Sequence, residues 1–161
     1  MTAYLEKLQL YYEEEIEGEA YFARLAARFA DPDCRRKLHL LAEVERHAAA
    51  GVAPLIARHG LSPRARAALT ASGHAEADAT ALDWSALMAG MRQSYPGYLA
   101  AFAALEALGP PEDRDLLSFL TEHEVAAIRF LEQEALDPTR STAPLETYLA
   151  TAPETWRAAA A

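Results

Sequence analysis

The chain has 161 residues, enough for one domain with its own core, and 52% of them are apolar, which argues against a disordered chain. Its formal net charge is −9 and its basic residues are scattered, so nucleic acid is excluded as an expected partner. A single cysteine, Cys34, excludes an internal disulfide and a cysteine metal cage. No uncharged apolar stretch of about 18 residues occurs, and the first residues lack a signal-peptide pattern. We therefore expect a cytoplasmic protein without a membrane span.

The first part of the chain is predicted to form two long helices joined by a tight turn. The first helix covers residues 2–30, and Pro32 with its flanking aspartates suits the start of the next helix. The second helix covers residues 32–59 and stops at Gly60, because glycine commonly follows the last helical residues. Two long helices with so short a turn are expected to pack as a hairpin.

A longer connection is expected before the second half of the chain. A short helix is predicted within residues 63–71, and the small, polar residues 72–81 are expected to form a crossover connection. A third long helix covers residues 83–108, and Pro96 is expected to kink or divide it. After a Gly-Pro-Pro break, a fourth helix covers residues 112–136.

The tail, residues 139–161, contains a short predicted helix at 145–149 and a tryptophan, Trp156, that we expect to pack on the helices or on a partner chain. Two helical hairpins joined by one long connection predict an all-α protein, a four-helix bundle with a C-terminal tail. An all-α domain of another topology is the alternative. The whole chain, residues 1–161, is interpreted as one domain.

Acidic residues interrupt the apolar stripes of three predicted helices. A stripe with steps of three and four residues contains Glu15 and Glu19 in the first helix, and Glu45 in the second. In the fourth helix, Glu124 occupies the stripe and His123 lies on its flank. Burying unpaired carboxylates costs several kcal/mol, so a bound cation is an economical explanation. Carboxylate and imidazole ligands suit iron or manganese, and these five residues are the candidate metal ligands.

The segment Ile16-Glu17-Gly18-Glu19, followed by an aromatic residue and Leu25-Ala26, resembles the first ligand helix of aldehyde-deformylating oxygenases. These enzymes belong, with rubrerythrins and other di-iron carboxylate proteins, to the ferritin-like superfamily. The resemblance covers about two helices. It implies a ferritin-like four-helix fold and a metal-ligand role for Glu19.

The chain departs from the family's Glu-x-x-His pattern on its two helices. Ala48 and Ala127 stand three residues after Glu45 and Glu124, where the family has histidine. The expected centre is therefore a reduced, carboxylate-rich metal site, or a site that has lost its metal. A buried polar network of glutamates with tyrosines and Arg24, or a groove filled by water, is the structural alternative.

Three functions follow as hypotheses. The first is an oxidoreductase that depends on iron or manganese, with its substrate beside the aromatic stripe of residues 84–105, which otherwise serves as ordinary core. The second is a non-catalytic ferritin-like bundle that binds a small hydrophobic ligand or a partner helix. The third is a structural homodimer that associates through helix faces and the Trp156 tail.

Overall fold

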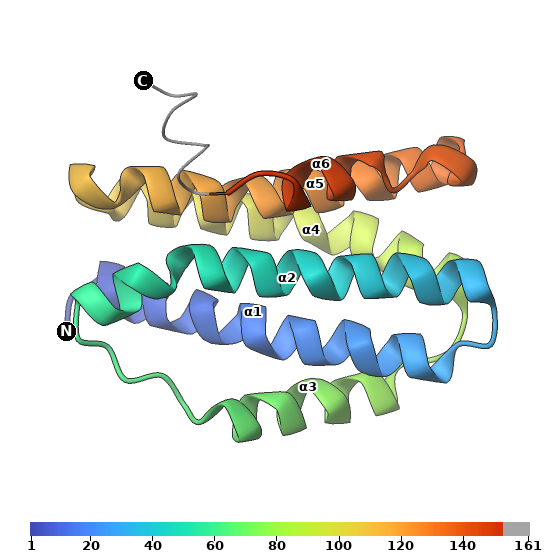
Figure 1. Ribbon diagram of the computed structural model, residues 1–161, viewed down its shortest axis with the longest axis horizontal. Coiled ribbons are helices and arrows are strands. Elements are labelled where there is room, and N and C mark those ends of the chain that lie inside the picture. Colours follow the sequence, from blue (N-terminus) through green and yellow to red (C-terminus); the bar gives the residue numbers. More distant parts are fainter. Residues whose placement is uncertain (153–161) are drawn as a thin grey trace.

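Figure 1 shows the computed structural model of the chain, which describes residues 1–152. This part of the chain is all-helical, as predicted, and contains no strand. Its elements are six α-helices and two short 3-10 turns: α1 (Ala3–Arg28), α2 (Pro32–Arg58), α3 (Arg66–Ala79), α4 (Trp84–Leu108), η1 (Pro111–Asp113), α5 (Arg114–Leu136), η2 (Pro138–Arg140) and α6 (Ala143–Leu149).

The four long helices lie side by side along the length of the molecule (Figure 1). α1 packs along α2, α4 packs along α5, and α2 joins the two pairs through its contacts with α5. α1 and α4 contact each other only sparsely. The main hydrophobic core lies between these helices, and α6 covers α5 and α2. None of the described helices has an apolar stretch of the length and hydropathy that a membrane crossing requires.

Side chains next to the helix ends explain where α1 and α2 begin. The Thr2 side chain accepts a hydrogen bond from the backbone N–H of Leu5 at 3.3 Å. The Asp31 carboxylate accepts from the N–H groups of Asp33 and Cys34, both at 2.9 Å, directly before the proline that opens α2. Such caps satisfy backbone donors that a helix start leaves unpaired.

The expected crossover connection at residues 72–81 is wrong, because most of it belongs to α3. This helix lies along α1, and buries Leu69, Gly73 and Ala77, which are spaced four residues apart. The spacing places them on one helix face, and the small side chains allow close approach. A Cβ atom on Gly73 would lie 2.3 Å from the backbone oxygen of Glu17. The composition that suggested a loop therefore serves tight helix packing.

Replacing Gly73 by alanine should lower the free energy of unfolding by about 1–3 kcal/mol, although alanine is the better helix former. The added methyl group meets the backbone of α1, which cannot move aside as a side-chain tip can. Gly90→Ala is the matched control, because a Cβ there meets nothing within 4 Å, and this change should stabilise. Urea denaturation of both variants measures the difference, and equal stabilities would refute the close packing.

Two buried ionic clusters lie near the two ends of α2. At its start, the Lys37 side chain is 1% exposed and its Nζ lies 2.8 Å from Oε2 of Glu134 on α5. The indole N–H of Trp84 donates to the same carboxylate at 3.0 Å. At the other end of α2, Asp113 accepts hydrogen bonds that join α1, α2 and η1. These clusters align the ends of the long helices.

The third long helix is not divided at Pro96, and its aromatic stripe is not all core. α4 runs unbroken through Pro96. Its aromatic stripe is only partly core, since Phe102 is buried whereas Tyr95 is half-buried and Tyr98 is 54% exposed. The two tyrosines face a cavity described below.

Near the end of the described residues, the short helix predicted at 145–149 is present as α6. Its buried Tyr148 donates a hydrogen bond to the backbone oxygen of Phe119 at 3.1 Å. Trp156, for which packing was expected, lies outside the described residues.

Candidate metal centre

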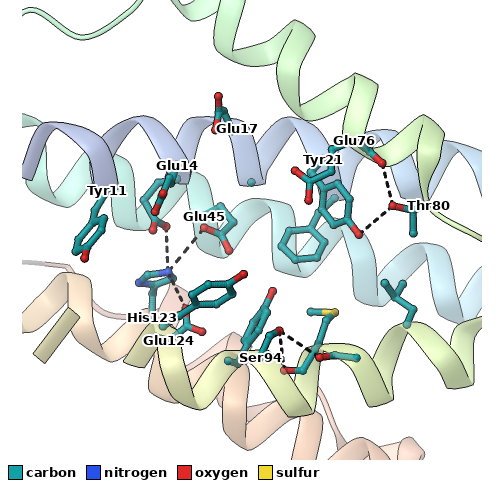
Figure 2. A pocket seen from close by; sticks show the side chains of 18 of the residues that line it. Tyr11, Glu14, Glu17, Tyr21, Glu45, Glu76, Thr80, Ser94, His123 and Glu124 are labelled. Carbon is teal, nitrogen blue, oxygen red and sulfur yellow. Dashed lines mark hydrogen bonds and ion pairs between the residues drawn. The ribbon is translucent and has the colours of Figure 1, made fainter. Parts of the chain in front are cut away.

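Three helices bring four of the five candidate ligands together. Glu15 comes from α1, Glu45 from α2, and His123 and Glu124 from α5. All four are buried, and His123 is 1% exposed. Figure 2 shows Glu45 and Glu124 on either side of His123, below the stretch of α1 that carries Glu14.

The carboxylates surround one nitrogen of the imidazole. Nε2 of His123 lies 3.0 Å from Oε2 of Glu15, 3.5 Å from Oε2 of Glu124 and 3.7 Å from Oε2 of Glu45. The ligand atoms that Glu15, Glu45 and His123 offer all lie within 4.8 Å of one another. This arrangement suits one shared partner between them.

The orientation of His123 is fixed from its other nitrogen. Nδ1 contacts the backbone oxygen of Leu120, which only accepts, so Nδ1 carries the hydrogen. Nε2 is then the nitrogen that faces the three carboxylates. A backbone carbonyl that orients a histidine in this way is a common feature of metal sites. The ring of Phe102 packs edge-on against the imidazole, with 5.0 Å between centroids.

The cluster carries more acceptors than donors. Oε2 of Glu15 and Oε1 of Glu124 are buried, and neither makes a hydrogen bond within the described chain. Such groups are rare in folded proteins and costly unless something compensates them. A cation or added protons must therefore accompany these carboxylates.

The excess of buried acidic groups also raises the pKa values of the three glutamates. Burial, together with the charge of Glu124, outweighs a hydrogen bond with Glu45 and raises the pKa of Glu15 to about 8. Burial and the charge of Glu45 raise the pKa of Glu124 to about 7, against the opposing effect of His123. Burial and the neighbouring Glu15 raise the pKa of Glu45 well above its usual 4.5. Without a cation, the cluster holds protons at neutral pH.

Gly18 leaves space for one of these carboxylates. A Cβ atom at this position of α1 would lie 3.1 Å from the carboxyl carbon of Glu45. That is closer than ordinary van der Waals contact, so a larger residue at position 18 would push the Glu45 carboxylate away. The glycine in the segment that suggested the family resemblance thus borders the cluster.

The fifth candidate, Glu19, does not join the cluster. Its carboxylate lies 3.6 Å from a guanidinium nitrogen of Arg66 on α3, and its side chain is 25% exposed. The reason is α3, which packs along α1 and pairs with Glu19. The network expected around Arg24 is also absent from the site, because Arg24 pairs with Asp78 of α3 at 2.8 Å.

A cavity of about 780 Å³ adjoins the cluster, between α1 and α4. Glu15, Glu45, His123 and Glu124 line it together with α4 side chains that include Tyr95. Most of the surrounding surface is apolar or aromatic. Burial and the charges of Glu45 and Glu124 raise the pKa of Tyr95 well above 10, so its hydroxyl remains a hydrogen-bond donor. Figure 2 shows the cavity from close by.

Sequence reasoning missed Glu14 and Tyr11, which also line the cavity. Glu14 belongs to the acidic run that begins at Glu13, and Tyr11 lies just before that run. Only the position of α4 determines which of these residues face the cavity.

The observed distances can be compared with those of a metal site. Two ligand atoms about 2.1 Å from one ion lie about 3.0 Å apart at a right angle and about 3.4 Å apart at the tetrahedral angle. The three distances around Nε2 of His123 span 3.0 to 3.7 Å. Small shifts of the carboxylates would therefore bring the ligand atoms within bonding distance of a single ion. These residues fit one iron or manganese ion.

Comparison with models of protein families, with curated proteins and with solved structures finds no match to this chain. The function is therefore inferred from the site itself.

Proposed function

We propose that this chain is a ferritin-like four-helix protein that binds one iron or manganese ion and uses it in an oxidoreductase reaction. The observation that carries the proposal is the donor set: three buried carboxylates around Nε2 of His123, with two carboxylate oxygens left without a hydrogen bond in the described chain. Oxygen and imidazole ligands from facing helices suit both metals.

Each residue has a distinct role in this proposal. Glu15, Glu45 and Glu124 supply oxygen ligands, and His123 supplies one nitrogen ligand that Leu120 orients. When bound, the ion would supply oxygen or peroxide activation at a coordination position open to the cavity. The chain's apolar walls would hold the substrate beside the ion and exclude water.

Replacing Glu45 by glutamine should weaken metal binding by at least about a hundredfold, because a charged ligand is lost. Glu19→Gln is the matched control, since Glu19 is a glutamate on the same stripe of α1 as Glu15 but pairs with Arg66 of α3. Both variants and the parent are loaded with Mn²⁺ or Fe²⁺ without oxygen, freed of excess metal and assayed for metal per chain. We expect about one ion in the parent and in Glu19→Gln. Equal metal contents in the two variants would place the ion elsewhere.

A non-catalytic bundle that has lost its metal is the second candidate. The hydrogen bond between the carboxyl groups of Glu15 and Glu45 favours it, because a shared proton can replace a cation. In this case the parent binds no metal, and Glu45→Gln is as stable as the parent or more stable, since an ionisable buried group is removed. The cavity would then hold a small hydrophobic ligand without chemistry.

A further inference from the structure

The charged side chains that line the cavity are all acidic. The residues that line it include no lysine and no arginine. Away from the buried cluster, three glutamates border it: Glu14 and Glu17 of α1, and Glu76 of α3. Glu17 is neutralised by Arg64, whose guanidinium lies 3.0 Å away. Arg28 does not line the cavity, and its guanidinium donates hydrogen bonds to the backbone oxygens of Ala77 and Thr80. The lining itself therefore presents an anionic ligand only with like charge.

The cavity is also elongated, and its two ends differ. On α1 its lining extends from Tyr11 to Phe22, and the part from Glu15 beside the cluster to Phe22 covers seven residues or about 10 Å. The buried cluster lies toward one end. Tyr21, Glu76 and Thr80 lie together at the other end (Figure 2). A ligand that spans this length can place one end beside His123 and the other beside Glu76.

The far end offers groups that suit a cation. The Tyr21 hydroxyl and Oγ1 of Thr80 are 3.4 Å apart, and both line the cavity with Glu76. An ammonium group donates hydrogen bonds to carboxylate and hydroxyl oxygens, and is attracted to an aromatic face. A neutral ligand would gain only the apolar contacts.

We propose that the cavity binds an apolar amine, with its ammonium group at Glu76 and its alkyl or aryl body extending toward the buried cluster. This proposal rests on the proposed function, because it makes the amine the substrate of the metal centre. The volume of the cavity points to a ligand beside the metal ion, whereas the buried Oε2 of Glu15 and Oε1 of Glu124 at its inner end point to the ion itself.

Calorimetric titration of the Mn²⁺-loaded protein tests the ligand class with three probes of equal length: octylammonium, 1-octanol and octanoate. We expect octylammonium to bind at least about tenfold more tightly than 1-octanol, and octanoate to bind more weakly than both. Glu76→Gln should reduce the affinity for octylammonium about fivefold and leave that for 1-octanol unchanged. Glu132→Gln, an exposed acidic residue on α5, is the matched control and should change neither affinity.

A cavity-filling variant shows whether the probes bind in the cavity at all. Gly90 lines it, and a Cβ there meets nothing within 4 Å, so Gly90→Leu should fold and fill space. We expect all three probes to lose binding while the circular dichroism spectrum stays unchanged. Unchanged octylammonium binding by Gly90→Leu would overturn the proposal.

The metal assay separates the two proposals. If the parent binds manganese but takes octanoate as tightly as octylammonium, or if Glu76→Gln and Glu132→Gln behave alike, the amine assignment fails and the metal centre stands. If the parent binds no metal but still prefers octylammonium in a manner that depends on Glu76, the ligand class stands and the metal-dependent function fails.

Discussion

Replacing Asp113 by alanine should lower the free energy of unfolding by about 3 kcal/mol or more. The Asp113 carboxylate is fully buried and accepts a hydrogen bond from the Tyr4 hydroxyl at 2.8 Å. It also contacts Nε2 of His59 at 2.6 Å and the Arg58 guanidinium. Burial alone would raise the pKa of Asp113, but these three partners outweigh it and lower the pKa. The ionised carboxylate therefore joins the start of α1 to the end of α2.

The control for this variant is Glu112→Ala, because Glu112 is the exposed neighbour in η1 and its side chain makes no ion pair in residues 1–152. Its stability should change by less than about 0.5 kcal/mol. Urea denaturation at neutral pH compares both with the parent. Because the pKa of Asp113 is lowered, its contribution is present above the unfolded value and is lost as the solution is acidified. A loss below 1 kcal/mol in Asp113→Ala would contradict this role.

Raising the pH from about 5 to about 8 should destabilise the metal-free protein by several kcal/mol. The pKa of Glu15 is raised to about 8 and that of Glu124 to about 7, so both keep protons in the folded state that they lose when unfolded. The folded state therefore binds more protons in this range, and stability falls as the pH rises. Asp113 and Glu13 have lowered pKa values and titrate below this range.

Thermal or urea unfolding at several pH values measures this slope. Glu15→Gln should flatten it, because glutamine stays neutral, whereas Glu19→Gln should leave it unchanged. Saturating Mn²⁺ should remove or reverse the slope, since the ion binds ionised carboxylates and competes with protons. A metal-free protein whose stability is constant from pH 5 to pH 8 would show that the cluster is not protonated as described.

The long helices could be predicted because their signals are local. The cap at Asp31 and the proline after it depend only on neighbouring backbone groups. The burial of Glu15, Glu45 and Glu124 follows from helical periodicity, since each occupies a position where an apolar residue is expected. Local sequence therefore indicates both the helices and most of the acidic residues that meet between them.

The sequence-based predictions are wrong where packing between distant segments determines the structure. Residues 72–79 look like a loop by composition, but they form part of α3 because Gly73 and Ala77 fit closely against α1. That packing draws Glu19 toward Arg66 and away from the cluster. Periodicity on α1 cannot distinguish Glu19 from Glu15, which lie on neighbouring sides of one face. Only the position of α3 separates them.

For the same reason, a pocket beside the aromatic stripe of residues 84–105 could be suggested from sequence only as an alternative to ordinary core. The aromatic stripe of α4 has the pattern of a buried helix, yet α4 and α1 do not close on each other, and Tyr98 is left 54% exposed. Sequence indicates which side chains share a face of α4. It does not indicate how far that face lies from α1, which decides whether the space is filled by core or left open to a ligand.

The most direct test of the metal centre is anomalous X-ray diffraction from crystals of the manganese-loaded protein, measured at a wavelength where manganese scatters anomalously. We expect one strong peak bounded by the carboxylates of Glu15 and Glu45 and by Nε2 of His123, and its loss in crystals of Glu45→Gln. A protein that carries manganese but shows its peak at another place, with these side chains unchanged, would contradict it.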